Sequence, residues 1–94
     1  MEGEPLSQDD AKRLVATILR AGGDVSFPRH ARQAMSADGL TREDILAVLR
    51  AGWAEPAEFE NEEWRYRMRA GLVFVVVAFP SRTNVRVVTC WRKK

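Results

Sequence analysis

The hydrophobic periodicity of this chain changes once, near residue 53. Before that point apolar residues recur at the spacing of amphipathic helices, and after it they alternate with the period of two that is typical of β-strands. Because helical and strand patterns occupy separate blocks, the chain is expected to fold as an α+β domain. A chain of 94 residues can bury one modest core, so we expect a single domain over residues 1–94.

The block of residues 7–52 is predicted to be helical. A capping serine or threonine opens the first and third helices, and Pro28 opens the second. Glycines or an Asp-Gly turn end the helices, and a short extended stretch, residues 25–27, separates the first two. The three helices are expected at about residues 8–21, 29–37 and 42–51. Residues 1–6 are expected to be disordered.

The block of residues 53–94 is predicted to form the sheet. Trp64, Tyr66 and Met68 alternate with three arginines, which indicates a strand with one apolar face and one cationic face. Residues 72–79 are apolar on both faces, as is typical of a central strand.

Two further strands complete the predicted sheet. One covers residues 85–91, where strict alternation places Cys90 on the arginine-bearing face and Thr89 and Trp91 on the other. Residues 54–60 are expected to add at most a short edge strand, because Pro56 interrupts them. The sequence therefore predicts three N-terminal helices packed on an antiparallel sheet of three or four strands.

Charge is distributed unevenly along the chain. Residues 1–63 carry seven Lys/Arg and all thirteen Asp/Glu, whereas residues 64–94 carry eight Lys/Arg and no acidic residue. A cationic block of this kind attracts polyanions, of which nucleic acid is the usual one, although it can also face acidic helices or an acidic protein partner. The residues predicted to bind RNA are Arg65, Arg67, Arg69, Arg86, Arg92 and Lys93.

Several classes of protein are excluded or disfavoured by the sequence. The longest uninterrupted apolar run, Leu72 to Phe79, has the length of a strand, so no membrane span is expected. The polar, acidic N-terminus does not resemble a signal peptide, and we predict a cytoplasmic protein. Cys90 is the only cysteine, which leaves no internal disulfide and no cysteine-based zinc site. Phosphate-loop, HExxH and GxSxG motifs are absent, so neither a metal nor a cofactor is expected.

Any catalysis must therefore use scattered side chains. A ribonuclease that uses the 2′-hydroxyl of RNA as its nucleophile needs only a general base, a general acid and cations near the phosphate. His30, the single histidine, suits proton transfer near neutral pH, and arginines suit a phosphate because the guanidinium group binds two oxygens at once.

Each of these candidates also has a purely structural interpretation. A lone histidine near a helix N-terminus, such as His30, is more often a surface or capping residue. Alternating arginines are common on the solvated face of an antiparallel sheet. Tyr66 shares the apolar face of its strand, where a core tyrosine with a hydrogen-bonded hydroxyl is the usual finding.

Five segments of the chain, taken in order, resemble a known family. They are the pattern F-x-x-H-A-x-x-x-M, then LTREDILAVLRAG, WRYRMRAG, VFVVVAF and VRVVTCWRK. Their order and spacing resemble the domain-of-unknown-function 4258 family, which is similar to the MqsR and RelE group of toxins. The resemblance covers about two-thirds of the chain, from Ser26 to Lys93.

This resemblance implies a toxin of a toxin–antitoxin pair that cleaves mRNA without a metal, on a RelE/MqsR-like sheet packed against N-terminal helices. It implies RNA and a cognate antitoxin as partners. The positions that match the family pattern are His30, Arg65, Tyr66, Arg67, Thr89 and Arg92. Of these, the predicted catalytic residues are His30, Arg65, Tyr66 and Arg67.

Two functions from different classes fit the sequence. The first is a metal-independent endoribonuclease, an mRNA interferase held inactive by its antitoxin. The second is a non-catalytic RNA-binding or protein-binding module that uses the same basic sheet face for contact alone. Cleavage that survives EDTA and is lost in His30→Ala would distinguish the first from the second.

Overall fold

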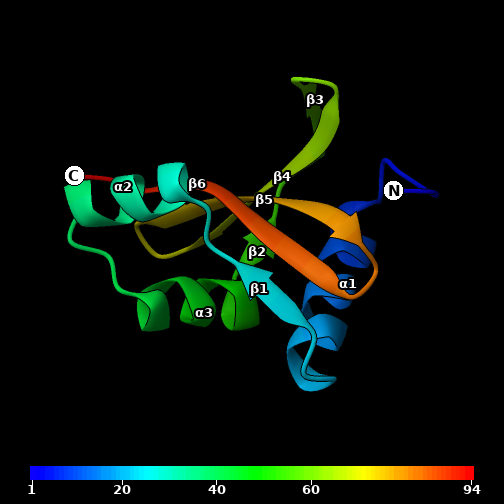
Figure 1. The fold of residues 1–94 in the computed structure, drawn as a ribbon, viewed down its shortest axis with the longest axis horizontal. Helices are drawn as coiled ribbons and strands as arrows, with labels where there is room; N and C mark the ends of the chain where they lie inside the picture. Colours follow the sequence, from blue (N-terminus) through cyan, green and yellow to red (C-terminus); the bar gives the residue numbers. More distant parts are fainter.

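Three helices and a six-stranded, mostly antiparallel mixed sheet form an α+β fold (Figure 1). The computed structural model describes all residues from Met1 to Lys94. The helices are α1 (Gln8–Arg20), α2 (Arg29–Ala37) and α3 (Arg42–Ala51). The strands are β1 (Asp24–Ser26), β2 (Trp53–Ala54), β3 (Glu58–Glu60), β4 (Glu63–Ala70), β5 (Val73–Ser81) and β6 (Asn84–Arg92).

The sheet has more strands than the three or four that the sequence predicts. The expected antiparallel meander of β4, β5 and β6 is present, but β1 joins it by pairing parallel with β6. Three residues are too few to show a strand periodicity, so the sequence indicates only an extended stretch there. The predicted edge segment divides around Pro56 into β2 and β3, which both pair with β4. The strand order is β1-β6-β5-β4-β2, with β3 beside β4.

The helices begin where the capping residues predict. The Ser7 hydroxyl accepts a hydrogen bond from the backbone N–H of Asp10 at 3.1 Å, which satisfies one free donor of α1. Thr41 and Asp44 form a reciprocal capping box at the start of α3. None of the three helices is long and apolar enough to cross a bilayer.

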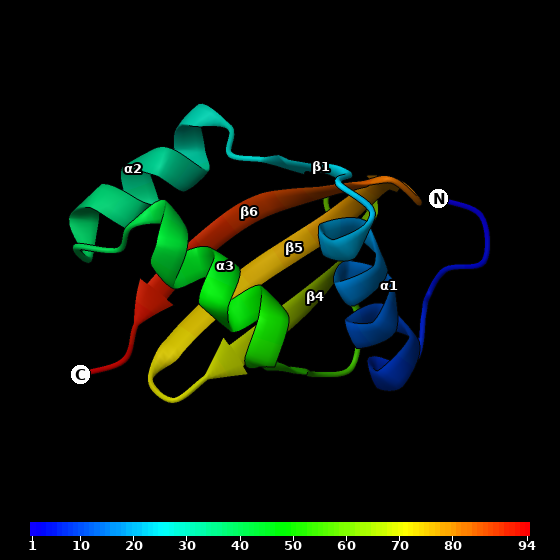
Figure 2. The same cartoon turned by 90° about the horizontal axis from the view of Figure 1, so that it is seen from below.

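One face of the sheet is covered by helices and the other is not. Figure 2 shows α1 and α3 crossing in front of β4, β5 and β6, while α2 packs alongside β6. Apolar side chains from both layers fill the space between them, and the largest of those that are fully buried belong to Ile18, Ile45, Leu49, Tyr66 and Met68. No helix covers the opposite face, which we call the open face (Figure 1).

A β-bulge in β6 reverses the orientation predicted for its last residues. Val76 lies opposite Thr89, but the next residue, Val77, lies opposite Val87, so one extra residue is inserted in β6. Cys90 consequently points into the core and is buried, not onto the arginine-bearing face as strict alternation predicts. By the same shift Thr89 is on the open face, in register with Val76.

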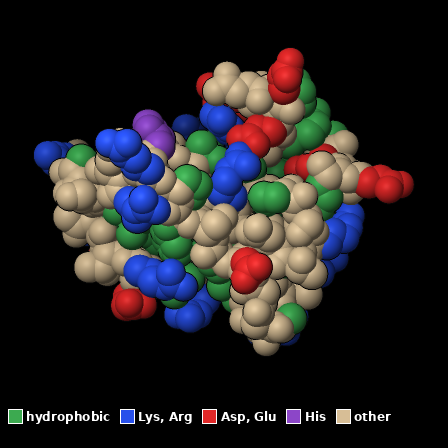
Figure 3. All heavy atoms as spheres, in the orientation of Figure 1, with side chains coloured by type: hydrophobic (Ala, Val, Ile, Leu, Met, Phe, Trp, Pro, Cys, Tyr) green, Lys and Arg blue, Asp and Glu red, His purple; other side chains and the backbone are tan.

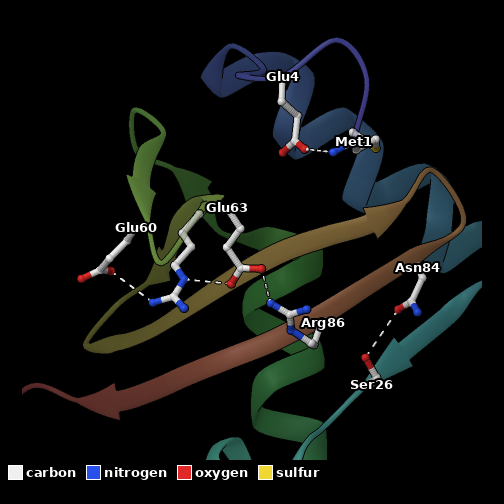
Figure 4. A network of polar contacts seen from close by, with 8 residues as sticks. Met1, Glu4, Ser26, Glu60, Glu63, Asn84 and Arg86 are labelled. Atoms are coloured by element: carbon white, nitrogen blue, oxygen red, sulfur yellow. Dashed lines mark hydrogen bonds and ion pairs between the residues drawn. The ribbon is translucent and has the colours of Figure 1, made fainter.

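The first six residues, which the sequence predicts to be disordered, instead pack against the sheet. The Tyr66 hydroxyl accepts a hydrogen bond from the backbone N–H of Leu6 and donates one to the Glu4 carboxylate, both at 2.9 Å. Glu4 also pairs with the ammonium group of Met1 at 2.8 Å, as Figure 4 shows. These contacts place the segment beside the core.

Candidate functional site

The open face gathers most of the side chains that the sequence predicts to bind RNA. β4 contributes Arg65, Arg67 and Arg69 from alternate positions, and the pairing of the strands places Arg86 of β6 on the same face. The bulge adds Trp91, which strict alternation assigns to the covered face. The face therefore carries four arginines with aromatic side chains among them.

A pocket of about 240 Å³ lies in the middle of the open face. Its floor is formed by Val76 and Thr89, which are paired across β5 and β6. Seven residues line the pocket, namely Glu58, Glu60, Arg65, Arg67, Val76, Thr89 and Trp91. Both charges, a hydroxyl group and an aromatic ring therefore meet around one small cavity.

Three of the four arginines of the open face, all except Arg69, are paired with carboxylates. Arg67 donates from Nη2 to Glu55 at 2.7 Å. Arg65 donates to Glu60 at 3.2 Å and to Glu63 at 3.0 Å. The positive charge of β4 is consequently offset by acidic residues that precede it or begin it in the chain.

Glu63 connects the two outer strands of this network. Its carboxylate accepts hydrogen bonds from the guanidinium groups of Arg65 and Arg86, and Figure 4 shows the contact with Arg86. Burial raises the pKa of Glu63, but hydrogen bonds from the two arginines outweigh this effect and hold the pKa below its ordinary value. Glu63 is therefore ionised at neutral pH and cannot act as a general acid there.

The Arg67–Glu55 pair behaves in the same way. The hydrogen bond from Arg67 lowers the pKa of Glu55. In turn, the hydrogen bond to Glu55 and the Glu55 charge raise the pKa of Arg67. Only Nη2 of Arg67 is used by Glu55, and Nε is enclosed without a hydrogen-bond partner. The Nη1 group makes no hydrogen bond within the protein and remains a donor for a ligand.

An aromatic row lies next to the pocket. Phe74 and Trp91 stack face to face, with ring centroids 5.1 Å apart and planes inclined by 5°. The guanidinium carbon of Arg69 lies 5.8 Å from the Phe74 ring centroid, at the outer end of the row. Phe74 therefore packs against Trp91, which lines the pocket.

Tyr66 is not part of this surface. Its side chain is fully buried on the covered face, and its ring lies 5.2 Å from that of Phe79. Burial raises the pKa of Tyr66 to about 12, with the nearby Glu4 carboxylate adding to the shift and the Leu6 N–H opposing it. The structure thus separates Tyr66 from the arginines on either side of it in the sequence.

His30 is exposed in the first turn of α2. It makes no side-chain hydrogen bond or ion pair with Arg65, Arg67 or Tyr66. Figure 3 shows side chains of both charges close together over β3 and β4, whereas the purple histidine over α2 has mainly basic neighbours. The four predicted catalytic residues therefore occupy three separate places in the structure.

The last two predicted RNA-binding residues lie beyond the pocket. Arg92 and Lys93 are exposed at the end of β6, where the backbone N–H of Arg92 donates to the Asp38 carboxylate at 2.7 Å. The bond joins β6 to the end of α2. No group of three or more His, Cys, Asp or Glu side chains is arranged to hold a metal ion.

Sequence reasoning missed the acidic side of the open face. Glu55, Glu58 and Glu60 precede the cationic block of residues 64–94. A charge count that divides the chain at residue 63 therefore assigns them to the acidic part of the chain and not to the face of the arginines. Pairing residues 54–60 with β4 as an antiparallel edge would have revealed them, because Glu58 is then opposite Arg65.

Comparison with known proteins identifies no relative of this chain. No protein-family model matches the sequence, and no curated protein or solved structure matches the chain.

Proposed function

We propose that this protein is a metal-independent endoribonuclease that binds single-stranded RNA on its open face. It would act as the toxin of a toxin–antitoxin pair, with mRNA as its substrate, as the resemblance implies. The single observation that carries the proposal is the 240 Å³ pocket, where arginines, a hydroxyl group and a stacked tryptophan surround one cavity.

RNA binding follows from the kinds of side chain around the pocket. Guanidinium groups bind phosphate oxygens in pairs, and Arg69 is the open-face arginine that no carboxylate occupies. Single-stranded bases stack on aromatic rings, which is the contact that Trp91 can offer. The arrangement suits a strand that places its phosphates along β4 and a base in the pocket.

His30 is the proposed proton-transfer group. It would take the proton of the 2′-hydroxyl as the 2′-oxygen attacks phosphorus. The bond from phosphorus to the 5′-oxygen breaks, which leaves a 2′,3′-cyclic phosphate, and the departing 5′-oxygen takes up a proton from water. Arginines would stabilise the charge that develops on the phosphate oxygens. Tyr66 has no role in this scheme, because it is buried on the other face with a pKa of about 12.

The scheme requires RNA to cross β6 towards α2. α2 packs along β6, so a strand bound on the open face meets α2 when it leaves the sheet on that side (Figure 1). Arg92 and Lys93 at the end of β6 would contact the phosphates there. The cognate antitoxin would inhibit the enzyme by covering this same surface.

A non-catalytic binding module is the second candidate, and the ion pairs favour it. Three of the four open-face arginines already have carboxylate partners, which weakens the attraction for RNA. The same face could then serve for contact with RNA or protein without cleavage.

Cleavage of a defined RNA in EDTA distinguishes the two. The parent protein should cut the RNA, and a substrate with 2′-deoxyribose at the cut site should remain intact. His30→Gln should keep the melting temperature and the RNA affinity while lowering the cleavage rate roughly a hundredfold. Cleavage at the parental rate by folded His30→Gln would remove His30 from the mechanism, and binding without any cleavage would favour the second candidate.

A further inference from the structure

The open-face pocket contains an acidic side chain that the proposed function does not use. Glu58 lies in β3 directly opposite Arg65 of β4, so both side chains are on the open face. It lines the pocket and makes no ion pair or side-chain hydrogen bond, although its charge helps to raise the pKa of Arg67 nearby. A free carboxylate in a site for a polyanion weakens phosphate binding, which suggests that Glu58 contacts another part of the ligand.

We infer that the pocket selects a guanine base, with Glu58 as the group that recognises it. This inference rests on the proposed RNA binding and adds the identity of the preferred base. Three features of the pocket carry it: its size, its acceptor and donor groups, and its aromatic side.

The size of the pocket suits a single base. Sites for drug-sized ligands begin at about 300 Å³, so a pocket of 240 Å³ is small for a whole nucleotide. The pocket is open to solvent above its floor of Val76 and Thr89, which leaves room for the attached sugar and phosphate outside it. A planar group can enter it while the backbone stays on the surface.

The hydrogen-bonding groups distinguish guanine from the other bases. A carboxylate only accepts hydrogen bonds, and guanine is the one RNA base with two neighbouring donors, N1–H and the 2-amino group, on its pairing edge. Adenine and cytosine each place an acceptor beside their amino group, and uracil has one donor between two acceptors. Glu58 therefore matches guanine with both oxygens and meets an acceptor in each of the other three bases.

The neighbouring strand, β4, supplies the complementary donor to the pocket. The Nη1 group of Arg67 is not used by Glu55, and arginine is the usual partner of the guanine O6 and N7 acceptors. Trp91 adds a surface for the base, held in place by its stack with Phe74. An acceptor, a donor and an aromatic ring thus surround the position of one purine.

Binding of short RNAs that differ in one base tests this inference. We would measure the fluorescence anisotropy of pentauridines in which the central base is guanine, adenine or hypoxanthine, with every 2′-hydroxyl methylated so that no cleavage occurs. Guanine should bind roughly tenfold more tightly than adenine, which is the scale of one bidentate base contact. Hypoxanthine, which lacks the 2-amino group, should fall between them.

Two variants of equal charge change show whether Glu58 is responsible. Glu58→Gln should bring the guanine-to-adenine ratio close to one while binding the adenine RNA as tightly as the parent or more tightly, since a negative charge is lost. Glu62→Gln, in the exposed turn between β3 and β4 and outside the pocket, should keep the parental ratio.

The outcomes separate this inference from the proposed function. Equal binding of guanine and adenine RNA by the parent would overturn the inference and leave RNA binding intact. A guanine preference that survives Glu58→Gln would also overturn it. Failure to bind any of the three RNAs would overturn both.

Discussion

The two faces of the sheet differ in how their side chains are stabilised. On the covered face Met68 and Val77 are fully buried, and the one polar atom of the large buried residues, the Tyr66 hydroxyl, has two hydrogen-bond partners. On the open face Arg65 and Arg67 are half-buried and are held by carboxylates. Adjacent residues of the same strand therefore belong to two different environments.

This difference shows which face is free to evolve a function. The covered face contributes the burial of apolar surface that drives folding, so any change there alters stability. The open face holds polar groups at the surface, where ion pairs add little to stability and can be exchanged for contacts with a ligand. Substitutions at neighbouring positions of one strand should therefore affect stability on the covered face and ligand binding on the open face.

The largest expected effect is a loss of stability on the covered face. Met68→Ala should lower the free energy of unfolding by about 2–5 kcal/mol, because it leaves a cavity in the core. Arg69→Ala, the next residue, should cost at most about 1 kcal/mol, since it removes one cation–π contact with Phe74. Urea denaturation of both variants measures this, and equal losses would contradict the division.

Tyr66 supplies a pH-dependent test of the covered face. Because it is the only tyrosine, the tyrosinate absorbance of the folded protein reports this residue alone. It should titrate at about 12 instead of the ordinary 10.0, since burial disfavours the charged form. Because the pKa of Tyr66 is higher in the folded protein than in the unfolded chain, the stability that the neutral side chain contributes to the fold is complete below pH 10.0. This contribution is lost as the pH rises through about 12. Titration near 10 in the folded protein would show that the hydroxyl is accessible.

The smallest effect should appear on the open face. Glu55→Gln removes the partner of Arg67, so affinity for single-stranded RNA should rise a few-fold at low salt. The slope of log K against log salt should steepen by about one as Arg67 becomes free to contact a phosphate. Glu43→Gln in the first turn of α3, which removes the same charge at a distance, serves as the control. Unchanged affinity in Glu55→Gln would show that Arg67 does not contact RNA.

The parts of the fold that local patterns determine could be predicted from the sequence. Capping by Ser7 and Thr41 is decided within three residues, and the predicted starts of α1 and α3 are confirmed. Alternation over β4 correctly assigned Tyr66 and Met68 to the core and the arginines to the other face. Each of these assignments depends on neighbours in the chain.

The remaining features depend on pairing between distant segments. The position of β1 is fixed by β6, about sixty residues further on, and the bulge in β6 is visible only through its register with Val76 and Val77. The Glu55–Arg67 pair likewise requires that residues 54–60 lie beside β4. A charge count by segments could not show that acidic residues share the face of the arginines.

The three tryptophan indole N–H signals test most directly whether RNA binds the open face. Trp91 lines the pocket there, whereas Trp64 packs towards the core and against Phe59. When a single-stranded RNA is added to the nitrogen-15-labelled protein, the Trp91 indole signal should move progressively to saturation while that of Trp64 stays in place. Movement of the Trp64 signal with Trp91 unaffected, at RNA concentrations that saturate binding, would contradict the account.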